Sequence, residues 1–213
     1  ELNVIDWVTK TLEKDDELEV VNRTPENFLN IQYRGGYTFL VAILGVQPLI
    51  RLHDVEPLFT EGSNPQLVVN VPSKTLWSGN AIRYVHAASA AFGSFGDISR
   101  AASTEDAGSY RNKNMGFFIT AMQQHSNVTD VSYVYDNVFT VDRKRGASLT
   151  VAVVDAYNMS AEDVRNARTK LGHFDIVVKS TNYGSITEQA KATAESMNVE
   201  ALMFRNLMER LDN

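Results

Sequence analysis

The sequence predicts an α/β protein built from two tandem copies of one unit, each with the element order αβββαβαβα. Two apolar segments, 39–44 and 149–154, resemble each other, and further matches keep the same order along both halves of the chain. The matched pairs, in chain order, are Trp7 and Phe118, Phe28 and Phe139, Arg34 and Arg145, Asp54 and Asp163, Val68 and Val177, Ala81 and Ala190, and Phe95 and Phe204. The offset falls only from 111 to 109 residues across this series. An ordered series of this length is typical of a tandem duplication.

Each copy is expected to begin with a helix and three strands. Apolar residues at helical spacing predict the helix, at 4–12 in the first copy and 117–124 in the second. The three β-like runs are expected at 18–21, 28–33 and 37–44, and at 131–135, 138–143 and 148–154. Gly35 and Gly146 mark hairpin turns, because glycine supplies the positive φ that a tight connection needs.

The second half of each copy alternates helices and strands. Ser160 is an N-cap candidate for the helix at 161–171, with Asp163 as a carboxylate near its positive end. The continuous Val/Ile character of 66–71 and 175–179 predicts strands covered on both faces. The remaining elements are helices at 52–59, 79–89, 96–102, 187–197 and 205–211, and strands at 91–95 and 199–204. We therefore expect repeats at 1–102 and 114–213, joined by a polar linker at 103–113.

The composition excludes several classes of protein. A net charge of −6 excludes a wholly basic phosphate-binding surface but leaves room for a local basic patch. The absence of cysteine excludes a disulfide scaffold and thiolate metal sites, and it fits a reducing cytoplasm. No apolar run is long enough to cross a bilayer, and the acidic N-terminal residues are unlike a signal peptide. We therefore expect a cytoplasmic protein without a membrane partner.

The closing part of the second copy carries a resemblance to a known family. The segment Phe174-Asp-Ile-Val-Val-Lys-Ser-Thr-Asn-Tyr-Gly-Ser-Ile-Thr-Glu-Gln-Ala190 combines a buried strand, a short loop with glycine and a helix that opens with a hydroxyl residue. It is similar to the closing segment of Mrr-like restriction enzymes. The order helix, three strands, helix, strand likewise resembles the core of the restriction-endonuclease-like superfamily.

The resemblance implies a place for metal-dependent chemistry. The superfamily places an Asp on the second strand and (Asp/Glu)-x-Lys on the third, where they hold Mg²⁺ and activate water. The matching positions in the second copy are Asp142 and Asp155, but Tyr157 stands where the lysine belongs, and Lys179 on the next strand is a displaced substitute. The matching positions in the first copy are Ile31, Gly45 and Gln47. The first copy is thus expected to lack this chemistry, and the second is incomplete.

Three other features are candidates for binding. Arg143, Lys144 and Arg145 form the densest basic cluster, and on a hairpin they could follow a phosphate backbone or simply be solvated. The loop before the helix at 187 offers hydroxyl and amide groups that suit either a small anion or helix capping: Ser180, Thr181, Asn182, Ser185 and Thr187. Trp77, in the corresponding loop of the first copy, is either a lid over the core or an interface anchor.

These observations favour a non-catalytic binding or regulatory protein on a nuclease-like scaffold. Its partner would be a nucleic acid or another protein, and the resemblance places it in microbial defence or DNA maintenance. Two alternatives stay open: a nuclease that uses Mg²⁺ at a single site in the second copy, and a sensor of small anions that binds between the copies. The binding role needs no cofactor, and an oligomer is compatible with all three.

Overall fold

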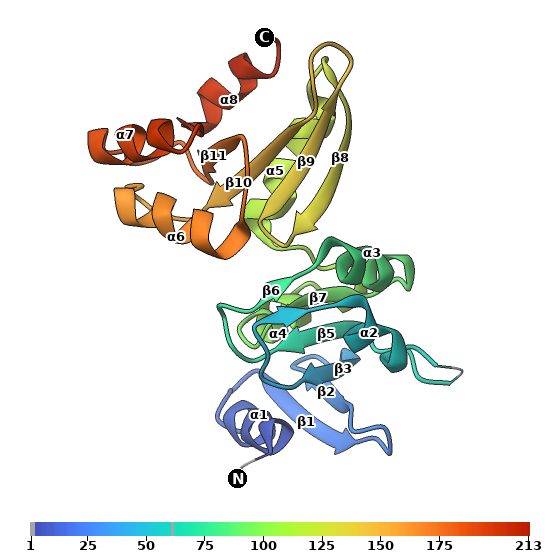
Figure 1. The fold of residues 1–213 in the computed structure, drawn as a ribbon. Coiled ribbons are helices and arrows are strands. Elements are labelled where there is room, and N and C mark those ends of the chain that lie inside the picture. The colour runs from blue at the N-terminus through green and yellow to red at the C-terminus, as the bar shows by residue number, and fades with distance from the viewer. Residues whose placement is uncertain (1–2, 61) are drawn as a thin grey trace. The chain divides into compact units, whose positions relative to one another are not determined.

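The computed structural model describes residues 3–60 and 62–213, and it confirms the α/β class. The chain divides into two compact units, the first ending at Asn112 and the second beginning at Lys113 (Figure 1). The elements of the first unit are α1 (Val4–Leu12), β1 (Leu18–Arg23), β2 (Leu29–Tyr33), β3 (Thr38–Leu44), β4 (Leu49–Ile50), α2 (Leu52–Val55), the 3₁₀ helix η1 (Glu56–Leu58), β5 (Leu67–Asn70), β6 (Leu76–Trp77), α3 (Gly79–Ala87), β7 (Ala91–Ser94), α4 (Asp97–Ser103) and the 3₁₀ helix η2 (Ala107–Ser109).

The main sheet of the first unit has the strand order β1-β2-β3-β5-β7. The three strands joined by hairpins pair antiparallel, whereas β3, β5 and β7 pair parallel. All four residues of β5 are buried, as expected for a strand covered on both faces. The first core cluster joins Val8 of α1 and Ile98 of α4 to the strand residues Ile31, Val41 and Val69.

The second unit contains α5 (Lys113–Gln124), β8 (Val128–Tyr135), β9 (Val138–Arg143), β10 (Leu149–Val154), α6 (Ala161–Leu171), β11 (Ile176–Lys179), α7 (Glu188–Ser196), β12 (Glu200–Leu202) and α8 (Phe204–Arg210). Its sheet has the order β12-β11-β10-β9-β8. The strands β8, β9 and β10 pair antiparallel, whereas β10, β11 and β12 pair parallel. Phe118 of α5 and Leu207 of α8 are buried against Phe139, Val151 and Val178 of the sheet.

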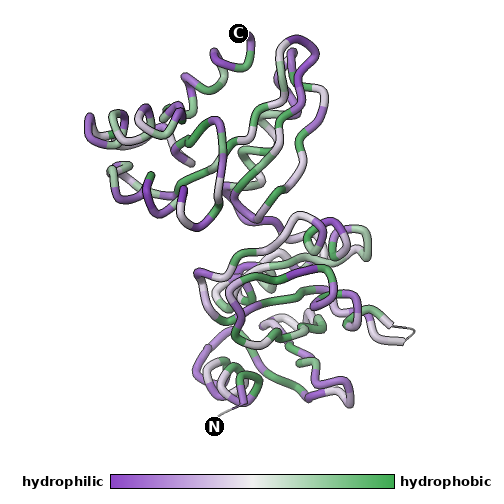
Figure 2. The backbone as a smooth tube through the Cα atoms, in the orientation of Figure 1, coloured by the Kyte–Doolittle hydropathy of each residue, from purple (hydrophilic) through white to green (hydrophobic). Residues whose placement is uncertain are grey.

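Hydropathy follows this architecture. The backbone is mostly apolar along the buried strands and polar at the turn between β9 and β10 (Figure 2). Ser160 caps α6 as predicted: its side chain accepts from the Asp163 amide, while the Asp163 carboxylate accepts from the Ser160 amide at 2.7 Å. No helix among the described residues is both long and apolar enough to span a bilayer.

Two predictions of local structure need correction. The segment predicted as a linker belongs largely to the first unit, because Ala107 and Tyr110 are buried in its core. The helix predicted at 52–59 ends at Val55 and continues as η1, because Pro57 cannot donate the backbone hydrogen bond that an α-helix requires. The short parallel pair of β4 and β6 was not predicted.

Candidate functional site

Asp155 and Lys179 meet at the edge of the second sheet where two parallel strands end. Val154, the last residue of β10, is paired with Lys179, the last residue of β11. The exposed Asp155 carboxylate accepts from the Ser180 hydroxyl at 2.9 Å and from the Asn114 side-chain amide at 3.3 Å. The sheet topology therefore brings together two of the three residues predicted for metal-dependent chemistry.

Lys179 is committed to the fold. Its side chain is fully buried, and its ammonium group donates to the backbone carbonyls of Ala156 and Tyr157. Burial lowers the pKa of Lys179, and the nearby Asp155 carboxylate partly opposes that shift. Since at least two of its three donors bind backbone oxygens, the predicted role of Lys179 as a substitute catalytic ammonium is wrong. It ties the loop after β10 to the end of β11.

Asp142 lies at the other end of the same hairpin. Val141 of β9 pairs with Leu149, the first residue of β10, and the Asp142 carboxylate accepts from the Ser148 hydroxyl. Asp155 follows Ser148 by seven residues, and about 3.3 Å per residue separates the two carboxylates by roughly 23 Å. The prediction that Asp142 and Asp155 share a metal is therefore wrong, because antiparallel pairing sends the ends of β9 and β10 in opposite directions.

The donors around Asp155 do not make a magnesium site. One carboxylate, one hydroxyl and one amide meet there, and the hydroxyl and the amide already donate to the carboxylate. No cluster of three or more His, Cys, Asp or Glu side chains able to hold a metal occurs within 3–60 and 62–213. Mg²⁺ in proteins is usually held by one or two carboxylates together with substrate phosphates, and this edge offers one carboxylate, Asp155.

One residue of the basic cluster is hydrogen-bonded within the fold, and the other two are exposed to solvent. Arg143 is half-buried, and its guanidinium donates to the backbone carbonyls of Ala147 at 2.9 Å and Leu211 at 3.3 Å. Leu211 is the C-cap of α8, so Arg143 satisfies a carbonyl at the negative end of that helix. Arg143 was predicted as a phosphate contact, but its guanidinium is used within the fold. Lys144 and Arg145 are exposed at the turn.

Asn127 holds this turn in place. It is 2% exposed, and its amide nitrogen donates to the carbonyls of Arg145 and Leu211. Its side-chain oxygen accepts from the Arg145 amide, and its carbonyl accepts from the Lys144 amide. The two exposed cations therefore stand on a backbone fixed to α8. The sequence analysis missed Asn127, because it began the strand at 131 whereas β8 begins at Val128, directly after this Asn.

The loop predicted as an anion site is occupied by internal hydrogen bonds. The Ser180 amide donates to Val154, the Thr187 amide donates to Met159, and the Ser185 amide donates to the Asn158 side chain, each at 3.0 Å. The Thr187 hydroxyl caps α7 by accepting from Ala190, and the Thr181 hydroxyl donates to the Tyr183 carbonyl. Asn182 is exposed. Of the five residues, Thr187 is the helix cap, and Ser180, Thr181 and Ser185 use their donors in contacts within the fold.

Two loops at this edge are locked together and present tyrosines to solvent. We define the paired loops as residues 155–160 and 180–187. Met159 and Ile186 form a parallel bridge, and Gly184, at φ +74°, lies so close to the Tyr157 carbonyl that a Cβ there would be 1.8 Å from its oxygen. Tyr157 and Tyr183 are 72% and 77% exposed. The sequence analysis noted Tyr157 only because it stands where the restriction-endonuclease-like superfamily has a lysine.

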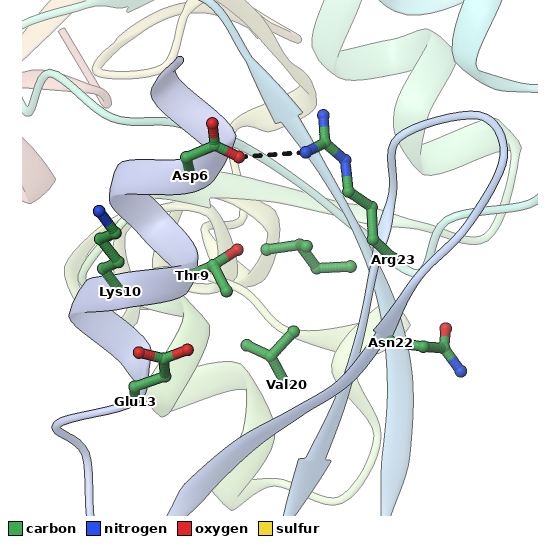
Figure 3. Close-up of a pocket in the computed structure, with 8 residues that line it drawn as sticks. Asp6, Thr9, Lys10, Glu13, Val20, Asn22 and Arg23 are labelled. Carbon is green, nitrogen blue, oxygen red and sulfur yellow. Dashed lines mark hydrogen bonds and ion pairs between the residues drawn. The ribbon is translucent and has the colours of Figure 1, made fainter. Parts of the chain in front are cut away.

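The first unit has a groove that the sequence did not indicate. It lies between α1 and β1 and is shown in Figure 3. Arg23 of β1 and Asp6 of α1 form an ion pair of 3.1 Å across it. Its lining residues are Asp6, Thr9, Lys10, Glu13, Val20, Asn22, Arg23 and Leu29. Two acidic and two basic side chains give the groove no preference for either sign of charge.

Comparison of this chain with models of known protein families, with curated proteins and with solved structures finds no match.

Proposed function

We propose that this protein is a non-catalytic binding or regulatory protein built from two copies of a nuclease-like unit. The observation that carries the proposal is the placement of Asp142 and Asp155 at opposite ends of the β9–β10 hairpin. A metal held between the second and third strands would need both carboxylates at the same edge of the sheet. Here one carboxylate supports the β9–β10 turn, and the other supports the start of the paired loops.

The shared topology supports the duplication. Both main sheets run through three antiparallel strands and then two more parallel strands, in the same spatial order. The helix after the third strand opens in both units with a carboxylate at its third position, Asp54 or Asp163, that accepts from the cap residue's amide. In both units, the segment after the third strand also pairs parallel with the segment after the next strand of the sheet. The pair is β4 and β6 in the first unit and Met159 and Ile186 in the second.

The first unit offers still less for metal chemistry. Ile31 is fully buried in the core, and Gly45 and Gln47 carry no carboxylate. Neither unit therefore presents the paired acids and free lysine that the resemblance to restriction enzymes would require. The proposal therefore assigns binding, and not cleavage of nucleic acid, to both units.

Lys144 and Arg145 are the residues that we propose for contact with nucleic acid. They are exposed, and Asn127 fixes the backbone that carries them. Phosphate contacts of this kind position a protein without reading the base sequence. Such contact belongs to a regulatory role in defence or DNA maintenance, which is the setting that the resemblance implies.

A plasmid-nicking assay with Mg²⁺ and with Mn²⁺ tests the absence of catalysis. We expect no cleavage above a buffer control from the full chain. Cleavage that Asp155→Ala abolishes and Asp142→Asn leaves intact would restore a nuclease with its site at the paired loops. Cleavage that survives both changes would indicate a contaminating enzyme, and a separately purified batch would then be expected to lack it.

Salt-dependent binding tests the nucleic-acid contact. Two phosphate contacts predict that log affinity for duplex DNA falls against log salt with a slope of about −2 at most. Lys144→Ala with Arg145→Ala should remove most of that slope, while Lys170→Ala, an exposed cation on α6, should leave it unchanged. Absence of binding at low salt would leave a protein as the partner.

A further inference from the structure

A chain of hydrogen bonds connects His125, at the end of α5, to the turn that carries the two exposed cations. We define the basic turn as residues 144–148, which join β9 to β10. The amides of Lys144 and Arg145 donate to the backbone carbonyl and to the side-chain oxygen of Asn127. The Asn127 amide in turn donates to Nδ1 of His125 at 3.1 Å. Asn127 therefore links the imidazole ring to the backbone of both cations.

The two ring nitrogens of His125 have fixed roles. A backbone amide can only donate, so Nδ1 accepts from Asn127 and carries no proton. A backbone carbonyl can only accept, so Nε2 carries the proton and donates to the Met208 carbonyl of α8 at 3.0 Å. The side chain is 9% exposed. These contacts therefore require the neutral imidazole in a single tautomer.

A second proton on the ring would break this chain of hydrogen bonds. Histidine is the side chain that ordinarily changes its charge between pH 5 and 8. Both nitrogens of the imidazolium are donors, so the Nδ1–H would face the Asn127 N–H and could no longer accept from it. The bond from Nε2 to the Met208 carbonyl needs no change on protonation. Acidification would therefore release Asn127 while the ring stays bound to α8.

Charged groups of both signs lie around His125. The Asp212 carboxylate, just after α8, lies 3.8 Å from Nε2 and attracts an imidazolium, whereas the Arg143 guanidinium at the Leu211 carbonyl repels one. Asp212 lies at Nε2, so it cannot replace the acceptor that Asn127 would lose at Nδ1. The other charged residues on the elements packed here are Lys113, Asp130, Asp142, Lys144, Arg145, Arg205, Glu209 and Arg210.

We propose that His125 makes the nucleic-acid contact sensitive to pH. This rests on the function proposed for Lys144 and Arg145 and names its regulation: the neutral ring holds the basic turn in place, and protonation loosens it. A contact on an ordered backbone loses less conformational entropy on binding than one on a mobile backbone. The ring is too little exposed to bind phosphate itself, and solvent ions screen its added charge. Binding should therefore weaken on acidification.

Amide hydrogen exchange, followed by NMR on the full chain, tests this clamp without nucleic acid. Between pH 7.5 and 5.5, protection of the Lys144 and Arg145 amides, corrected for intrinsic rates, should fall by about threefold or more, since one hydrogen bond is lost. His125→Gln should keep its protection, because a glutamine amide can accept and donate at the same places without titrating. His173→Gln, at a side chain 64% exposed in the same unit, is the matched control and should follow the wild type. Unchanged protection in the wild type, or an equal fall in His125→Gln, would overturn the proposal.

A titration of the unmodified protein gives a measurement that does not depend on a variant. The amide resonances of Lys144 and Arg145 should shift with pH at the same midpoint as the ring signals of His125. Amides that do not shift, or that follow the midpoint of another group, would show that His125 does not control the turn.

Binding to duplex DNA at low salt, measured by fluorescence anisotropy at pH 7.5 and 5.5, tests the regulation itself. The affinity of the wild type should fall about threefold or more relative to that of His125→Gln over this range. An affinity that rises, or that changes equally in both proteins, would overturn the regulation. Absence of binding at both pH values would instead refute the proposed nucleic-acid contact, and the exchange experiment would still decide whether His125 clamps the turn.

Discussion

In both units the last residue of a central strand is a buried polar side chain that binds a neighbouring segment, but the chemistry differs. We call this place the junction. In the first unit, Asn70 at the end of β5 is 2% exposed, and its side-chain oxygen accepts from the Trp77 indole at 2.6 Å. In the second unit, Lys179 at the end of β11 donates to the carbonyls of Ala156 and Tyr157. In both, a buried polar residue on the last position of a central strand ties down a neighbouring loop.

The comparison shows what the fold requires at this position. It requires a buried group that satisfies polar atoms of the loops, since an unpaired polar atom there would be costly. It does not require a particular residue type. A lysine beside an aspartate at the end of a strand resembles catalytic machinery, but its counterpart in the first unit shows that a structural demand is enough to explain it.

The indole also makes the first junction the more apolar of the two. Trp77 is 2% exposed and packs against Phe92, with 5.0 Å between ring centroids. Of the two roles predicted for Trp77, the lid over the core is the correct one. The largest single loss of stability is therefore expected in the first unit.

Trp77→Ala should lower the free energy of unfolding of the first unit by about 3–5 kcal/mol, because it empties a buried aromatic site and leaves Asn70 without its donor. Urea unfolding followed by the fluorescence of the remaining tryptophan measures it in each variant, since the two tryptophans of the chain both lie in the first unit. Trp7→Ala, at a site 42% exposed, is the control and should cost much less. Equal costs for the two variants would refute the junction account.

Gly184→Ala should cost about 2–4 kcal/mol, because a methyl group there would meet the Tyr157 carbonyl. Gly172→Ala isolates that clash: Gly172 has a similar φ of +78°, and an added Cβ would have nothing within 4 Å. The control carries the cost of its backbone alone, about 1–3 kcal/mol, because φ +78° with ψ −141° is a conformation that essentially only glycine adopts. Unfolding followed by circular dichroism gives both values, and a Gly184 variant no less stable than the Gly172 variant would contradict the locked loops.

Lys179→Met should cost about 1–3 kcal/mol, because the stem is replaced at similar volume while two loop carbonyls lose their donor. Lys191→Met, which removes an exposed ion pair with Glu188, should change stability by less than about 0.5 kcal/mol. Chemical denaturation followed by circular dichroism compares the two. Wild-type stability in Lys179→Met would show that the buried ammonium is dispensable and would weaken the comparison between the junctions.

The sequence predicted the element order well because the signals were local. Continuous apolar runs marked β5 and β11, and Ser160 with Asp163 marked the start of α6. The predicted end of a helix was wrong where one residue could not make the helical hydrogen bond, as at Pro57 after α2. These features depend on neighbours within a few positions, so the sequence contains them directly.

The candidate site was harder because it depends on strand direction. Asp142 and Asp155 are both near strand ends in the sequence, but an antiparallel pair places those ends far apart. The partners of Lys179 and Asn127 were also beyond sequence reasoning, since they are backbone carbonyls on other segments. A carbonyl is present at every residue, and only the folded chain selects which one a side chain reaches.

The smallest expected effect comes from a second difference between the units, on the helix that follows the junction. His86 of α3 is largely buried, whereas the matching residue of α7, Glu195, is exposed. Burial, with the nearby Arg111 cation, lowers the pKa of His86 to about 4 from 6.5. The unfolded chain therefore binds a proton near pH 6.5, where the folded unit does not.

It follows that His86 favours the folded state above pH 6.5, and that this contribution falls as the pH drops from 6.5 towards 4. Between pH 7 and pH 5 the wild-type first unit should lose more stability than the His86→Gln variant, as measured by urea unfolding with tryptophan fluorescence. His53→Gln, at a side chain 71% exposed, should follow the wild type. The same pH dependence in wild type and His86→Gln would show that another group carries the acid sensitivity of the first unit.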